Sequence, residues 1–165
     1  MIAENLEKAY ENGEDREARR NMMIASTIGG MAFISSNVGA VHAFAETVGA
    51  WFDTPHGVAN SLFLPYIMEF NIPACPERFA DIADAMGIER EESMSDEQYA
   101  LKAVEYVKAL NRKLNIPTIK EIKGITEERF EAIAERSANN VLSNDNARKI
   151  TKEDYLELLK KAYNE

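Results

Sequence analysis

Helical periodicity is the feature that most constrains the fold of this 165-residue chain. Apolar residues recur every three to four positions through most of the sequence, and very few stretches show the strict alternation of a half-buried strand. Ser95 and Gln98 have the spacing of a capping box ahead of Val104, Val107 and Leu110. The sequence therefore predicts an all-α fold, an irregular bundle of about six to eight helices.

The first two predicted helices differ in character. Positions 2–12 form a short amphipathic segment that ends at Gly13. The next helix, from Asp15, is charged in its first turns and apolar after Met22, so we expect it to enter the core at its far end. Gly29 and Gly30 would then permit a neighbouring helix to approach closely, although each glycine weakens a helix by about 1 kcal/mol.

The remaining helices follow from caps and breaks along the chain. Pro65 lies inside one of them and predicts a kink or break there. We find no internal repeat and no low-complexity linker, so the chain is expected to form one domain over residues 1–165. The predicted helices cover 38–49, His56 to about Phe70, Pro76 to Gly87, Ser95 to Leu114, Thr126 through Val141, and Thr151 onward.

Composition excludes several classes of function. The chain has 28 acidic and 19 basic residues, a net charge of -9, which argues against binding nucleic acid. Cys75 is the single cysteine, so no intramolecular disulfide is possible and a reducing cytosol is suitable. The first residues are charged, which does not fit a signal peptide, and no stretch approaches the roughly 20 apolar residues that span a bilayer. We expect a cytoplasmic protein that binds neither nucleic acid nor membrane.

Both histidines of the chain lie between Asn37 and Asn60. His42 and Glu46 are four residues apart in a predicted helix, so their side chains project from the same face. His56 follows a bend and would begin the next helix. Two imidazoles and a carboxylate suit divalent iron or zinc, and Asp53 is a second carboxylate candidate.

A structural interpretation competes with this metal site. His42 would then be a hydrogen-bonded core histidine, His56 would cap a turn, and Glu46 would be exposed or paired with a cation. Spacing alone does not decide between the two, because polar residues four positions apart often occur by chance.

A family resemblance favours the metal site. The run from Gly39 to Asn71, "GAVHAFAETVGAWFDTPHGVANSLFLPYIMEFN", resembles the signature region of the iron-containing (group III) alcohol dehydrogenases, especially the lactaldehyde reductase and propanediol dehydrogenase branch. The likeness continues through "MSDEQYALKAVEYVKALNRKLNIP" and "NARKITKEDYLELLKKAY". It implies the carboxy-terminal helical metal-binding domain of that family, which is dehydroquinate synthase-like, with His42 and His56 as metal ligands.

The same resemblance implies what this chain lacks. The family's amino-terminal nucleotide-binding domain, with its glycine-rich turn, has no counterpart here, and two further metal ligands come from the segment that precedes the likeness. Glu46 stands where many relatives have a histidine near the metal and substrate, so its catalytic role is open. The implied cofactors are Fe2+ (or Zn2+) and, only with a separate amino-terminal domain, NAD(P).

Three hypotheses follow. The first is the metal-binding half of an NAD(P)-dependent alcohol dehydrogenase for small alcohols, diols or aldehydes, inactive alone, with Phe33, Trp51 and Phe52 as a candidate substrate wall or simply core. The second is a non-catalytic helical module that binds a partner or self-associates. The third is a small stand-alone metal-binding protein in which Glu46 replaces the lost ligands. The expected partners are a nucleotide-binding domain or subunit and further copies of the chain.

Overall fold

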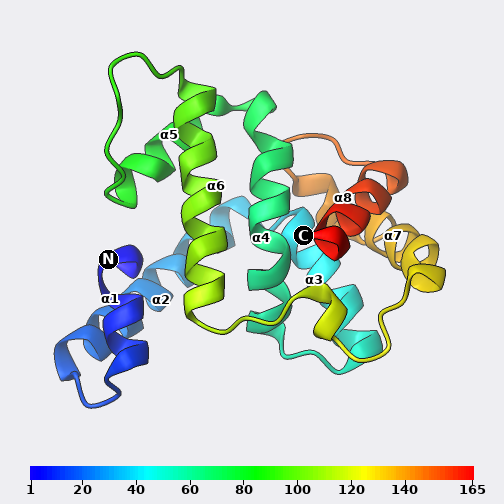
Figure 1. The fold of residues 1–165 in the computed structure, drawn as a ribbon, viewed down its shortest axis with the longest axis horizontal. Coiled ribbons are helices and arrows are strands. Elements are labelled where there is room, and N and C mark those ends of the chain that lie inside the picture. Colours follow the sequence, from blue (N-terminus) through cyan, green and yellow to red (C-terminus); the bar gives the residue numbers. More distant parts are fainter.

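The computed structural model describes all residues from 1 to 165 and contains eight α-helices and no strand, as predicted (Figure 1). Four short 3-10 turns connect some of them, at Ile72–Ala74, Ile119–Glu121, Glu127–Arg129 and Val141–Asp145. The helices are α1 (Ile2–Glu11), α2 (Arg16–Ser36), α3 (Ala40–Phe52), α4 (His56–Asn71), α5 (Pro76–Ala85), α6 (Asp96–Lys113), α7 (Phe130–Ala138) and α8 (Lys152–Asn164).

Side-chain caps define where several helices begin. The capping box of Ser95 and Gln98 is formed at the start of α6, and Thr151 makes a second one with Asp154 ahead of α8. Thr126 makes no side-chain cap and precedes a 3-10 turn. The helix predicted from Thr126 through Val141 is therefore wrong at both ends, because α7 covers only Phe130–Ala138.

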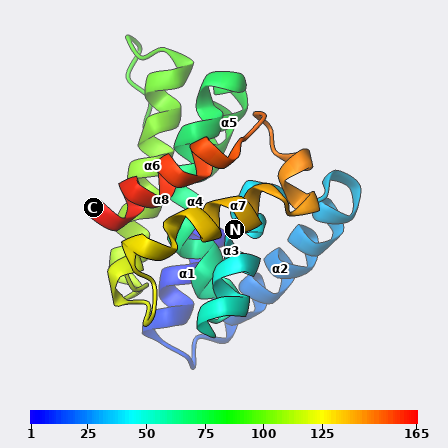
Figure 2. The same ribbon diagram turned by 90° about the vertical axis from the view of Figure 1, so that its right-hand side faces the viewer.

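Two apolar clusters make up the core, and α4 contributes to both. The larger gathers side chains of α3, α4, α7 and α8, including Phe44, Phe63 and Tyr155. The smaller lies between α5, α6 and the far end of α4 around Tyr99. Figure 2 shows α7 crossing in front of the upper end of α3. The buried residues of α3 are Ala40, Ala43, Phe44, Ala45, Thr47 and Val48. This matches the prediction of a largely buried helix there.

Pro65 does not break α4, contrary to one predicted outcome. The proline lacks an N–H, so it leaves the carbonyl oxygen of Ser61 without its helical partner. The side chain of Asn111 on α6 donates a hydrogen bond to that oxygen at 2.6 Å. A neighbouring helix thus satisfies the acceptor, and α4 runs without interruption from His56 to Asn71.

The prediction that α2 enters the core at its far end is wrong. Only Ala18 and Ala25 of this helix are buried, and α2 packs chiefly against α1. An added Cβ at Gly29 or Gly30 would meet nothing within 4 Å, so no helix approaches these glycines. Its exposed large apolar side chains are Met23, Ile24, Ile28, Met31, Phe33 and Ile34.

No single helix is long and apolar enough to cross a membrane, although α2 and α3, bent by 108° at their junction, pass such a test as a pair.

A buried hydroxyl network fastens α8 to the larger cluster. The hydroxyls of Tyr155 and Ser143 are 2.7 Å apart, and Ser143 also donates to the carbonyl oxygen of Ser137. Ser137 in turn donates to Thr47 on α3 at 3.2 Å. Burial raises the pKa of Tyr155 to about 12.

This raised pKa predicts a loss of stability in alkali. The unfolded tyrosine has a pKa of about 10. The contribution of the neutral Tyr155 hydroxyl to the free energy of unfolding is therefore fully present below pH 10 and is lost as the pH rises toward 12. At pH 11 the loss from Tyr155 is expected to be about 1.4 kcal/mol. Urea unfolding at pH 9 and 11 checks it: the free energy of unfolding should fall by about this much more in the wild type than in Tyr155→Phe, and equal falls would contradict the assignment.

Candidate metal centre

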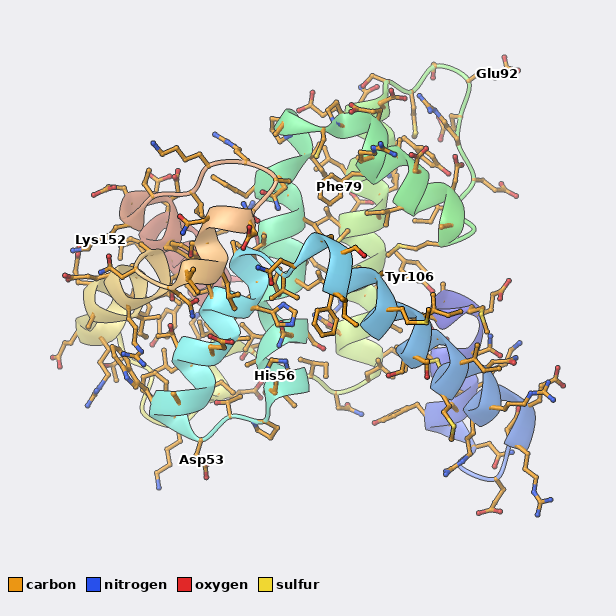
Figure 3. The ribbon with its side chains drawn as sticks, turned by 180° about the vertical axis from the view of Figure 1, so that it is seen from behind. Asp53, His56, Phe79, Glu92, Tyr106 and Lys152 are labelled. Atoms are coloured by element: carbon orange, nitrogen blue, oxygen red, sulfur yellow. The ribbon has the colours of Figure 1, made fainter.

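The two histidines meet where α3 and α4 begin. His42 lies in the first turn of α3, and His56 is the first residue of α4. Their ring centroids are 5.3 Å apart with the planes tilted by 52°. Asp53, in the left-handed region with φ of 50°, turns the chain between the helices. Figure 3 shows His56 on the side of the molecule along which α2 runs.

An asparagine pair fixes the start of α3 against the end of α4. The side-chain oxygen of Asn146 accepts hydrogen bonds from the backbone N–H of Ala40 and from Asn71 at 3.3 and 3.0 Å. Asn146 returns a hydrogen bond to the oxygen of Asn71 at 2.7 Å. A Cβ at Gly39 would lie only 3.1 Å from the side-chain oxygen of Asn146, so the cap position leaves little room for a larger residue. The sequence contained no local signal for this contact between residues 75 positions apart.

The histidine pair fits two ligands of one metal ion. Imidazoles bound to a tetrahedral ion through nitrogens about 2.1 Å away have ring centroids about 5 Å apart, close to the observed 5.3 Å. Beside them, the side-chain oxygen of Asn60 is buried without a hydrogen-bond partner. No group of three or more His, Cys, Asp or Glu side chains gathers in the chain to hold an ion. The structure therefore brings together two candidate ligands.

Electrostatics keep His42 in the form that binds metal. Burial lowers its pKa below the ordinary 6.5, the neighbouring His56 lowers it further, and Glu46 acts in the opposite direction. A lowered pKa means that the neutral imidazole predominates at neutral pH. The neutral form carries the free electron pair that a metal requires.

Glu46 is turned toward a different neighbour. Its carboxylate is exposed and accepts a hydrogen bond from the side chain of Asn140 at 2.7 Å. It borders a pocket of about 520 Å³ between α3 and α7, together with Trp51 and Arg136. The predicted spacing placed Glu46 on the same helix as His42, but its carboxylate does not line the pocket that contains the histidines.

The histidine pocket has a volume of about 510 Å³, and its apolar lining differs from the one suggested by sequence. Phe33 is half exposed on α2, the Arg136 guanidinium lies over the ring of Trp51, and Phe52 packs against Gly124. None of these three aromatic residues lines the pocket. Its lining besides His42 and His56 is Val38, Gly39, Val41, Gly57, Asn60, Ser61 and Leu64.

Comparison with known proteins identifies the setting of this site. The family model described as "Fe-containing alcohol dehydrogenase family, C-terminal" matches residues 1–163. The chain belongs to the iron-containing alcohol dehydrogenase family. Its eight helices correspond to the carboxy-terminal domain of these alcohol dehydrogenases, and both histidines lie within the matched residues.

Individual members of the iron-containing alcohol dehydrogenase family match over almost the whole chain. The 1,3-propanediol dehydrogenase of Citrobacter freundii is 37% identical over 99% of the chain and 42% of the relative. The lactaldehyde reductase of Escherichia coli K12 is 38% identical over 90% of the chain and 39% of the relative. The structure of an alcohol dehydrogenase from Oenococcus oeni superposes with a TM-score of 0.93 at 39% identity, covering 98% of the chain and 42% of that chain. The chain thus spans about two-fifths of the length of these relatives.

Proposed function

We propose that this chain is the metal-binding half of an NAD(P)-dependent alcohol dehydrogenase for small alcohols, diols or aldehydes, and that it is inactive until a second polypeptide completes the site. The observation that carries this proposal is the paired His42 and His56, 5.3 Å apart beside a pocket of about 510 Å³, with no third ligand gathered around them. Iron is the metal named by the family, and zinc would suit the same imidazoles.

Each part of the pocket has a stated task in this proposal. His42 and His56 hold the ion, which as a Lewis acid lowers the pKa of a bound alcohol. Val38, Val41 and Leu64 provide apolar contact for a short carbon chain and exclude water from one side. In this proposal the nicotinamide that would accept the hydride is held by the second polypeptide. A single cysteine suits a reducing cytoplasm.

The apolar side of α2 is where we place the second polypeptide. At 100° per residue, Met23, Ile24, Ile28, Met31 and Ile34 share one side of the helix. They are 43% to 79% exposed, which leaves apolar surface on the order of several hundred Å². Relatives carry more than half of their length outside the matched region, which supports the proposal that a further segment covers this surface.

The same surface supports a second candidate function. A second copy of the chain would also bury the apolar side of α2, and the chain would then be a self-associating module without catalysis. A stable interface buries roughly 800 Å² on each partner, so a dimer would have to bury neighbouring surface together with this patch. The third hypothesis, a stand-alone metal protein, requires Glu46 to leave Asn140 and become a ligand.

Complementation tests the main proposal. The chain is mixed anaerobically with Fe2+ and the amino-terminal part of the Citrobacter freundii 1,3-propanediol dehydrogenase that precedes the matched region. With NAD and 1,3-propanediol, we expect NADH formation only when both polypeptides are present. The proposal would be contradicted if the two polypeptides formed no complex and produced no NADH at any protein ratio.

Charged substitutions on α2 sharpen the same experiment. Ile28→Glu with Met31→Glu should abolish the complex in size-exclusion chromatography, because two carboxylates would be desolvated at the interface. Val141→Glu is the control, since Val141 is at least as exposed as these two residues and lies on the turn after α7. The self-associating module would be favoured by two results together. The isolated chain would form a dimer that the α2 variants disrupt, and mixing with the amino-terminal part would produce no NADH.

A further inference from the structure

Asn60 lies one helical turn after His56 and contacts it twice. Its side-chain nitrogen donates to the carbonyl oxygen of His56 at 2.9 Å and lies 3.1 Å from the Nε2 atom of the same residue. Its side-chain oxygen is buried and has no hydrogen-bond partner. An asparagine that leaves its own acceptor unsatisfied beside a candidate metal ligand calls for a chemical explanation.

The orientation of the amide follows from its neighbours. Turning the Asn60 amide over would bring its oxygen to 2.9 Å from the His56 carbonyl oxygen, so that two acceptors would face each other. It would also bury two N–H groups without partners in place of one oxygen. The amide therefore points its nitrogen at the ring, and Nε2 is the acceptor of that hydrogen bond.

This contact sets the tautomer of His56. A neutral imidazole has one N–H and one free electron pair. If Nε2 accepts from Asn60, the proton of the ring is on Nδ1. The electron pair that a metal ion needs is then the one that Asn60 already occupies.

We propose that Asn60 is a latch on His56 that opposes metal binding in the uncombined chain. The inference rests on the proposed metal-binding function. An ion that binds Nε2 must displace the amide nitrogen. An ion that binds Nδ1 sends the ring proton to Nε2, where it would face another N–H, so the amide is displaced again. Both routes break the hydrogen bond at 3.1 Å.

The direction of this hydrogen bond is opposite to that of the hydrogen bond that usually supports a metal-bound histidine. Such a histidine generally donates its remote N–H to a carboxylate or carbonyl, which strengthens metal binding. Asn60 donates to the ring instead. Removing one neutral hydrogen bond of this kind should therefore tighten metal binding about two- to tenfold.

Nuclear magnetic resonance of the metal-free chain tests the latch itself. The chain has two histidines, and His42→Gln assigns the remaining ring directly. We expect long-range 1H–15N spectra in mildly alkaline buffer to show His56 protonated on Nδ1. Asn60→Leu should release the ring to both tautomers, and Asn60→Asp, an acceptor of the same shape, should reverse the preference to Nε2–H. A wild-type His56 protonated on Nε2 would overturn the proposal.

Zinc titration by calorimetry tests its consequence. Asn60→Leu should bind Zn2+ about two- to tenfold more tightly than the wild type. Thr27→Ala is the control, because the Thr27 hydroxyl also donates to a carbonyl oxygen four residues earlier, that of Met23, and Thr27 does not line the pocket. Weaker binding by Asn60→Leu would overturn the latch. Absence of zinc binding in every variant would refute the proposed function, while the spectra would still decide whether Asn60 holds His56.

Discussion

Replacement of Phe44 by alanine is expected to lower the free energy of unfolding by about 3–5 kcal/mol, the largest effect of any single substitution we consider. Phe44 is completely buried and stacks on Phe63 with ring centroids 4.2 Å apart. The ring of Tyr155 meets it edge-on at 4.6 Å. These contacts join α3, α4 and α8, so the cavity left by alanine would open at the centre of the larger cluster.

The effect should extend to the metal centre. His42 is two residues before Phe44 on α3, and Phe63 is on the same helix as His56. The stacked pair therefore holds the two helices, and with them both imidazoles, at a fixed separation. We expect Phe44→Ala to weaken zinc binding as well as stability, even under conditions where most molecules remain folded.

Urea unfolding followed by circular dichroism measures this prediction. Leu101→Ala, at a position 37% exposed on α6, is the control and should cost less than about 1 kcal/mol. The free energy of unfolding of a domain of this size is about 5–15 kcal/mol, so Phe44→Ala would remove a large share of the stability. Equal midpoints for the two variants would show that Phe44 does not hold the helices together.

Local rules explain the parts of the fold that the sequence predicted. The capping box predicted at Ser95 and the helix start predicted at Thr151 depend on residues three positions apart, and the structure forms both. The apolar composition around Phe44 likewise indicated a buried helix. In each case the relevant interaction partners are neighbours in the sequence or share one helix face.

The errors arose where a distant residue or a missing surface decides the outcome. Periodicity shows which side of α2 needs apolar contact, but it cannot show whether this chain supplies the covering surface, and here it does not. Pro65 continues its helix because Asn111, on another helix, satisfies the freed carbonyl of Ser61. The single-domain assignment over residues 1–165 and the roles of the site residues stay predictions.

Glu46 illustrates the limit of spacing arguments at the site. Helical spacing correctly placed it one turn from His42, but its carboxylate is held by Asn140, 94 residues later in the chain. A side chain on the right face has several rotamers, and tertiary contacts select among them. The i, i+4 pattern therefore indicated proximity without indicating coordination.

Substitutions of the two histidines and of Glu46 should therefore have different effects on the metal affinity of the isolated chain. His42→Ala or His56→Ala is expected to weaken Zn2+ or Co2+ binding by about 100-fold or more, because each removes one of only two ligands that the structure brings together. Glu46→Gln should change the affinity less than about threefold, since glutamine can still accept from Asn140 and the carboxylate is not at the ion.

Calorimetry with zinc and absorption spectra with cobalt measure these affinities, and circular dichroism verifies that each variant folds. The comparison also separates two of the hypotheses. If Glu46→Gln lost metal as fully as the histidine variants, the carboxylate would have left Asn140 to become a third ligand, as a stand-alone metal protein requires. If Glu46→Gln kept its affinity, two imidazoles would be the whole contribution of this chain. The remaining coordination positions would then have to be filled by water, by the substrate, or by the polypeptide that we expect to cover α2.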